Sequence, residues 1–90
     1  MPQISAFDGI EIYMYYNDHL PPHFHAFYAG EEAIILIGTS IRQPAVHKGA
    51  LPRKQLRLVL MWANERSEEL VENWEFARAG KKLKKIAPLS

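Results

Sequence analysis

The apolar residues of this chain change their spacing at Pro52, and this change constrains the fold more than any other feature of the sequence. Before Pro52 they alternate with polar residues or form a short β-branched run, which is typical of strands. After Pro52 they recur about every 3.6 residues, which is typical of an amphipathic helix. We therefore predict an α+β fold, in which a small antiparallel sheet of about four strands packs against a long C-terminal helix.

Turn residues divide the first half into short strands. Asp8 and Gly9 form a turn signal between the first two strands, and Pro21 and Pro22 end the second because proline cannot donate to a ladder. We predict strands at residues 4–7, 10–16, 23–28 and 33–37. The β-branched run in the last of these is typical of a strand that is buried on both faces. Residues 39–48 could add a short edge strand containing Ile41, Ala45 and Val46, interrupted by Pro44.

The second half carries one continuous apolar stripe, which favours a single helix. The stripe consists of Leu56, Val59, Leu60, Ala63, Leu70, Val71, Trp74 and Ala77. Against continuity, Ser67 followed by two glutamates is a good helix start, so a kink or break near Asn64 to Ser67 is the alternative. Gly80 ends the helix, and residues 81–86 return as a final strand or as a tail.

A second group of apolar residues lies beside this stripe. Leu58, Trp62 and Phe76 widen the apolar face beyond what one sheet would cover. One interpretation is that the strand-rich half curls around the helix and buries them. The other is that they form an interface with a second copy or with another protein, because large aromatic residues are enriched at interface cores.

Size and composition indicate one small intracellular domain. The chain has 90 residues, which suits a single domain over 1–90. It has no cysteine, so no disulfide can compensate for a small core, and a homodimer would be a natural supplement. The absence of cysteine suits the cytoplasm. No segment resembles a secretory signal or is long enough to cross a bilayer, so we expect no membrane association.

Three of the four histidines lie within seven positions, in the segment Asn17 to His25. On a strand, His23 and His25 share one face and their rings can converge, whereas Phe24 points to the other face and anchors the strand in the core. His19 precedes the two prolines and joins the pair only if the chain turns. Histidine exchanges protons and binds metals near neutral pH, so this segment is the candidate site.

Three uses of this cluster compete. The first is a transition-metal site, in which His23 and His25 are joined by His19 or Asp18. The second is metal-free acid–base chemistry on a phosphodiester, in which one neutral and one protonated imidazole exchange a proton. The third is structural, with the imidazoles and Asp18 hydrogen-bonded to the surrounding loop.

Basic residues favour an anionic ligand. Arg53, Lys54 and Arg57 crowd the first turns of the predicted helix, where the helix dipole repels positive charge. Together with the free amides at that end they could bind a phosphate or a carboxylate, or they could be ordinary solvated surface residues. If the strand face that carries His23 and His25 reaches the same end of the helix, the two groups form one site.

The motifs along the chain resemble a known family. They are Phe7-Asp8-Gly9-Ile10, Asn17-Asp18-His19, Pro21-Pro22-His23-Phe24-His25-Ala26, Leu51-Pro52, Trp62-Ala63, Glu72-Asn73-Trp74-Glu75 and Ala77-Arg78-Ala79-Gly80-Lys81. The chain is similar in these motifs to the small bacterial domain-of-unknown-function family 4160. The loop over residues 38–47 is the least typical part, which leaves the roles of Arg42 and His47 open. The resemblance implies a cytosolic protein often encoded beside a member of family 2442, in pairs that look like toxin–antitoxin modules, with this chain as the toxin-like member.

These observations combine into one preferred hypothesis. The chain acts on or binds RNA or another anionic substrate, as a metal-independent, ribonuclease-like protein with no obligatory cofactor and a small cognate partner protein. His23, His25 and Asp18 are the predicted catalytic residues. The predicted substrate contacts are His19, Arg53, Lys54 and Arg57. The first alternative is a non-catalytic interaction or dimerisation domain with structural histidines, and the second is a metal-binding module through His19, His23 and His25.

Overall fold

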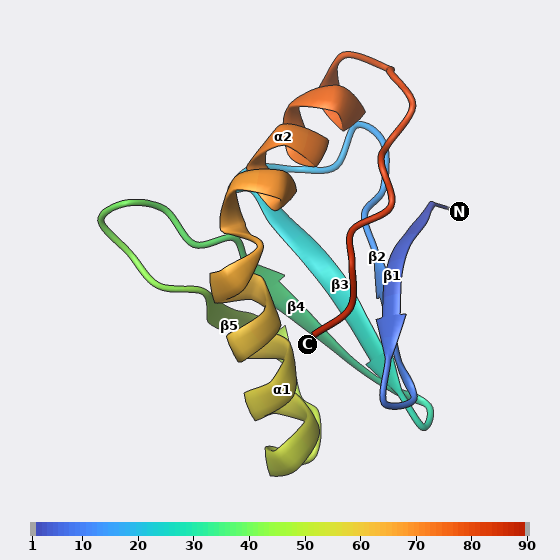
Figure 1. The fold of residues 1–90 in the computed structure, drawn as a ribbon, viewed down its shortest axis with the longest axis vertical. Helices are drawn as coiled ribbons and strands as arrows, with labels where there is room; N and C mark the ends of the chain where they lie inside the picture. The colour runs from blue at the N-terminus through green and yellow to red at the C-terminus, as the bar shows by residue number, and fades with distance from the viewer. Residues whose placement is uncertain (1, 90) are drawn as a thin grey trace.

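Five antiparallel strands, each paired with the next along the chain, form the sheet of this protein, whose structure is a computed structural model that describes residues 2–89 (Figure 1). The strands are β1 (Gln3–Phe7), β2 (Ile10–Tyr13), β3 (His23–Tyr28), β4 (Glu31–Leu36) and β5 (Ala45–Gly49). Two helices, α1 (Arg53–Glu65) and α2 (Ser67–Arg78), pack on one face of the sheet. The predicted α+β class is confirmed, with five strands where about four were expected. No helix within residues 2–89 is long and apolar enough to cross a membrane.

The fifth strand is the edge strand that the sequence signalled only weakly. It begins directly after Pro44, and all of its residues are exposed. Ile41, which was expected in this strand, lies in the preceding loop and is 94% exposed. Strand β4 is not buried on both faces as predicted: Ala33 and Ile35 are fully buried, but Ile34 on the opposite face is only half-buried. One face of the sheet therefore lacks a covering layer of helices, and the candidate site lies on that face.

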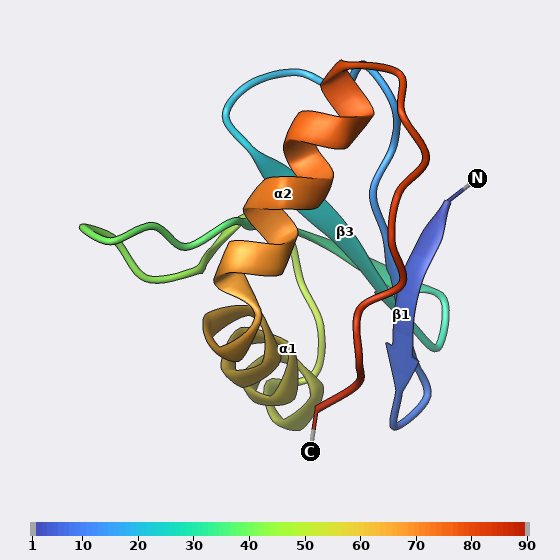
Figure 2. The same cartoon turned by 45° about the horizontal axis from the view of Figure 1, so that its top comes forward.

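The long helix is divided at Arg66. Its backbone has φ −108° and ψ 21°, which departs from helical values, although its amide still donates to the carbonyl of Trp62 at 2.9 Å. The alternative of a break near Asn64 to Ser67 is the correct one, and Figure 2 shows the change of direction between α1 and α2. Val59 in α1 and Leu70 in α2 are both fully buried, so a single apolar register survives the break.

Trp62 lies in the centre of the core and not at an interface. Its side chain is fully buried, and its ring lies 5.5 Å from the ring of Phe7 and 5.6 Å from that of Phe24. The prediction that Trp62 forms part of a partner interface is therefore wrong. Leu58 is partly buried against the same core, and Phe76 is half-buried.

The C-terminal tail explains why the wide apolar face of the helices is covered. Residues 81–89 run between the helices and β1 as an extended tail without strand assignment (Figures 1 and 2). The amide of Ile86 donates to the carbonyl of Ile4 at 2.8 Å, and the indole N–H of Trp62 donates to the carbonyl of Ala87 at 2.8 Å. The tail thus joins β1 to α1, and Ile86 itself is only 4% exposed.

Candidate functional site

The connection between β2 and β3 brings Asp18 over the histidines of β3. Met14 anchors its start, since this side chain is fully buried and its amide donates to the carbonyl of Pro2 at 3.2 Å. Asn17 has a φ of 55°, a left-handed conformation that asparagine tolerates better than most residues, and the chain turns there. The amide of His19 then donates to Oδ1 of Asp18 at 2.9 Å, which orients the carboxylate.

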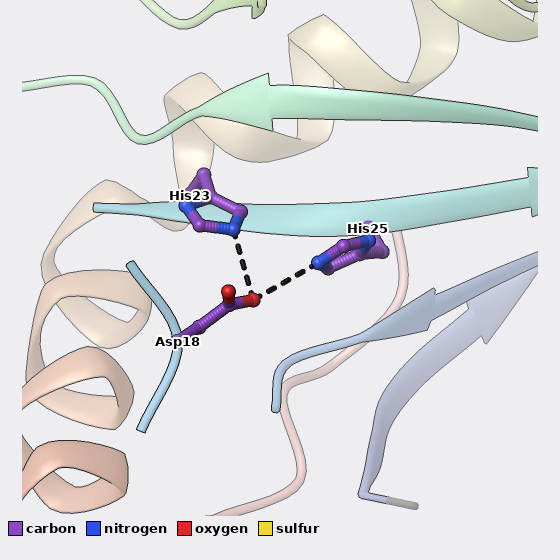
Figure 3. A group of neighbouring side chains, drawn as sticks. All are labelled: Asp18, His23 and His25. Atoms are coloured by element: carbon purple, nitrogen blue, oxygen red, sulfur yellow. Dashed lines mark hydrogen bonds and ion pairs between the residues drawn. The ribbon is translucent and has the colours of Figure 1, made fainter. Parts of the chain in front are cut away.

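His23 and His25 meet at one oxygen of that carboxylate (Figure 3). Nε2 of His23 lies 2.9 Å from Oδ2 of Asp18, and Nε2 of His25 lies 3.1 Å from the same atom. The centres of the two rings are 5.3 Å apart. The prediction that the two imidazoles share a face and converge is borne out by this geometry, with Asp18 as the third member of the group.

The other nitrogen of each ring also faces an acceptor. Nδ1 of His23 lies 2.8 Å from the carbonyl oxygen of Pro21, and Nδ1 of His25 lies 2.8 Å from Oε2 of Glu32. Since a carbonyl oxygen can only accept, Nδ1 of His23 carries a hydrogen. A neutral ring with its hydrogen on Nδ1 has only a lone pair on Nε2, and that lone pair would face the lone pairs of Asp18.

Because lone pairs would otherwise face one another, the contacts of the two rings are satisfied by additional protons or by a cation. One solution places a proton on both nitrogens of each ring, which makes two imidazolium ions side by side. The other places one cation between the two Nε2 atoms and Oδ2, so that all three lone pairs point at it. Asp18, His23 and His25 form a group whose ligand atoms all lie within 4.8 Å of one another.

The charges around Asp18 keep its carboxylate ionised. Partial burial acts to raise the pKa of Asp18, but when the two rings are protonated the hydrogen bonds from His25 and from the backbone amide of His19, together with the charge of His23, outweigh it and lower the pKa. Beside it, burial and the negative charge of Glu32 raise the pKa of Tyr15. The ring of Tyr15 packs edge-on against that of His25, with centres 4.5 Å apart.

Both histidines are largely buried. Phe24 is fully buried on the opposite face, as predicted for the residue that anchors β3. His23, expected to face outward, is only 8% exposed, and its ring centre lies 5.3 Å from that of the buried Trp74 on α2. The side chain of His25 is 12% exposed. The pair is therefore less open to water than the alternation of residues along β3 suggested.

A cavity of about 160 Å³ adjoins the group. It is lined by Asp18, His19, Leu20, Pro21, His23, His25, Ile34, His47 and Lys48. His19 is exposed at its rim and does not belong to the group of convergent ligand atoms among residues 2–89. Strand β5 contributes His47 and Lys48, so the edge strand takes part in the site.

The basic residues predicted to hold phosphate lie elsewhere. Arg53 and Arg57 line a second cavity of about 430 Å³ beside α1, which shares no lining residue with the histidine cavity. Lys54 is exposed on the same first turn and lines neither cavity. The structure therefore does not bring the start of α1 together with His23 and His25, because β3 begins near α2 while α1 begins at the far end of the helix pair (Figure 1).

Several residues of the site were missed by sequence reasoning. Glu32 lies on the same sheet face as His25, diagonally across the β3–β4 hairpin, since His25 pairs with Ile34. The turn at Ala29 and Gly30 contained enough information to predict this neighbour. His47 and Lys48 could not be found in this way, because their position depends on how β5 pairs with β4. Tyr15 was missed because it precedes the segment Asn17 to His25 in which the site was expected.

Fold and site together define a small α+β domain with a histidine–carboxylate cluster on the open face of its sheet. The model of the family described as "Domain of unknown function (DUF4160)" matches residues 9–75, so the chain belongs to this family. The matched region contains the whole cluster and both walls of the cavity. Searches of curated proteins and of solved structures return no significant match.

Proposed function

We propose that this protein binds one divalent transition-metal ion, with zinc as the first candidate, through Asp18, His23 and His25. One observation carries the proposal: the Nε2 atoms of both histidines face the same carboxylate oxygen, while both Nδ1 atoms face other acceptors. A single metal ion at the point of convergence satisfies all three lone pairs. It also avoids placing two imidazolium ions side by side.

The distances suit a shared ion. Bonds of about 2.1 Å from a metal to nitrogen and oxygen place neighbouring ligand atoms about 3.0 Å apart in octahedral and about 3.4 Å apart in tetrahedral geometry. The observed separations from Oδ2 of Asp18 are 2.9 Å to His23 and 3.1 Å to His25. Both separations match the octahedral spacing, and tetrahedral coordination requires the two nitrogens to move about 0.3–0.5 Å away from Oδ2.

The second ring nitrogens support the same assignment. A histidine that ligates a metal through one nitrogen nearly always donates the other N–H to a carboxylate or a backbone carbonyl, which fixes the ring and raises its basicity. Here Pro21 supplies the carbonyl for His23, and Glu32 supplies the carboxylate for His25. Asp18 is held in turn by the amide of His19.

The site is of the catalytic type and not the structural type. Structural zinc sites are closed by four protein ligands, whereas catalytic sites keep three and leave a position for water or substrate. The convergent group has three members, and these three residues line the adjoining cavity. A metal held there would act as a Lewis acid and lower the pKa of a bound water for hydrolysis.

The geometry favours this proposal over the metal-independent one. Acid–base catalysis without metal needs one imidazole to present a free nitrogen to the substrate, but here all four ring nitrogens face acceptors of the protein. Action on RNA, a small partner protein and the toxin-like role stay predictions from the sequence. They are compatible with a metal site.

Metal titration tests the proposal. The untagged chain, purified without added metal, is titrated with zinc by calorimetry, and the bound metal is counted by elemental analysis. We expect one zinc per chain, and we expect Asp18→Ala and His25→Ala each to weaken binding by more than about 100-fold, since each removes a ligand.

His19→Ala is the matched control, because it removes an imidazole from the same loop without removing a ligand. It should keep the stoichiometry and nearly the affinity of the wild type. A wild-type chain that takes up no zinc, or that binds it equally well without Asp18 and His25, would contradict the proposal and leave the structural interpretation of the cluster.

A further inference from the structure

We propose that the cavity beside the metal site binds a phosphate group through Lys48 and His47 of β5. This inference rests on the proposed metal site and extends it by assigning the chemical class of the ligand. It replaces Arg53, Lys54 and Arg57 as the predicted phosphate contacts.

An irregularity in β5 carries the inference. In a regular strand, adjacent side chains point to opposite faces of the sheet, so His47 and Lys48 should not line the same cavity. The pairing of β4 with β5 shifts between Ile34 and Ile35: Lys48 pairs with Ile34 and Val46 with Ile35, which leaves His47 as an extra residue. Such a bulge re-aims a side chain, and here both residues line the cavity.

The strand register places Lys48, Ile34 and His25 side by side across three neighbouring strands. Lys48 pairs with Ile34, and Ile34 pairs with His25. Partners across antiparallel strands project from the same face, so Lys48 and His25 lie on the open face on either side of Ile34. A ligand bound between them would contact both the lysine and a metal ion held by His25.

Charge and size indicate what this ligand is. Asp18 contributes one negative charge to the cavity and Lys48 one positive charge, so a divalent ion would make the whole cavity positive. Lysine is a common phosphate ligand as a point charge, and histidine adds a further donor. The volume of about 160 Å³ is below the roughly 300 Å³ or more of pockets that enclose a drug-sized ligand, so the cavity accepts a phosphate group and not a whole nucleotide.

The test measures phosphate binding to the zinc-loaded protein. Inorganic phosphate, adenosine monophosphate and a trinucleotide are titrated separately by calorimetry, and zinc content is determined for every sample. We expect the wild type to bind phosphate groups, and Lys48→Ala to weaken this binding about tenfold or more. His47→Ala should weaken it less, because histidine contributes a donor without a permanent charge. Equal binding of inorganic phosphate and adenosine monophosphate means that the phosphate group alone is recognised. Tighter binding of the trinucleotide means that a phosphodiester is recognised, and both results support the inference.

Lys82→Ala is the control, since it removes the same charge from an exposed position in the tail. It should bind phosphate as the wild type does, and zinc content should be unchanged in all three variants. Zinc binding with no phosphate binding overturns this inference alone. Unchanged phosphate affinity in Lys48→Ala also overturns the phosphate site but not the metal site. The lysine would then serve to protect an exposed sheet edge from aggregation. A chain that binds no zinc overturns the metal site and, with it, this inference.

Discussion

Glu32 shows how much of the site depends on a residue that is not itself a proposed ligand. It reaches Nδ1 of His25 from the neighbouring strand at 2.8 Å, although its own side chain is 44% exposed. A carboxylate in this position fixes which ring nitrogen carries the hydrogen and leaves the other free for the metal. The partner of His23 is a backbone carbonyl, which mutation cannot remove, so Glu32 offers the cleaner test at the residue scale.

We predict that Glu32→Gln lowers zinc affinity about 10- to 100-fold, because the amide holds the ring less strongly and does not raise its basicity. Zinc titration of the purified variant gives the change in affinity. Glu31→Gln is the matched control, since it removes the same charge from the exposed adjacent residue and should bind zinc as the wild type does. Equal affinity in both variants would mean that Glu32 does not support the metal site.

The position of strand β5 depends on a close approach of its last residue to β4. Gly49 has a φ of 78°, a conformation that side chains disfavour. A Cβ atom at this position would press against the carbonyl oxygen of Glu32 and lie 3.2 Å from Cα of Ala33. The end of β5 and the backbone that carries Glu32 are thus in direct contact, which links the cavity wall to the metal site.

Gly49→Ala is expected to destabilise the fold more than Gly30→Ala, by at least about 1 kcal/mol in free energy of unfolding. Gly30 is the matched control because its φ is 83° but nothing lies within 4 Å of the added Cβ, so it bears only the cost of the left-handed conformation, about 1 kcal/mol. Urea denaturation measures both. Equal losses would mean that β5 moves away from Glu32 at little cost.

The C-terminal tail holds the two layers of the molecule together. Asn73 on α2 is 1% exposed and holds the tail at both polar ends of its amide. Its Nδ2 donates to the carbonyl of Lys84 at 2.8 Å, and its Oδ1 accepts from the amide of Lys84 at 2.9 Å. Since the tail also hydrogen-bonds β1 and Trp62, it holds the sheet and the helices together.

Asn73→Ala should lower the free energy of unfolding by about 1–3 kcal/mol, because it removes both hydrogen bonds from the partly buried amide and carbonyl of Lys84. Denaturation in urea provides the value. Asn64→Ala, at an exposed position on α1, serves as the control and should stay within about 0.5 kcal/mol of the wild type. A loss of the same small size in both variants would show that the tail contributes little to stability.

Periodicity was sufficient to predict most of the fold. The alternation along β1 to β3 and the helical stripe after Pro52 predicted the class, the order of elements and the burial of Phe24. The weakest prediction was β5, because its five residues are all exposed and carry no apolar pattern. Trp62 was misassigned because the tail that covers it has no strand or helix periodicity from which its return over the helices could be predicted.

The sequence predicted the central residues of the candidate site but not how their side chains are oriented. The spacing of His23 and His25 predicted a shared face, and Asp18 was named as a partner of the rings. The orientation of the two rings depends on their contacts with Pro21 and Glu32. The wall of the cavity opposite the rings depends on a bulge in β5. Neither the contacts nor the bulge follows from the spacing of residues along the chain. Arg53 and Arg57 were placed at the site because sequence patterns do not tell which end of a helix meets which end of a strand.

A crystal structure of the zinc-soaked protein, with anomalous diffraction measured at the zinc edge, shows whether the proposed metal site exists. We predict one anomalous peak at the convergence of Asp18, His23 and His25, about 2.0–2.2 Å from Oδ2 and from each Nε2. A protein without such a peak, or with zinc bound only by exposed histidines such as His19 and His47, would contradict the proposal.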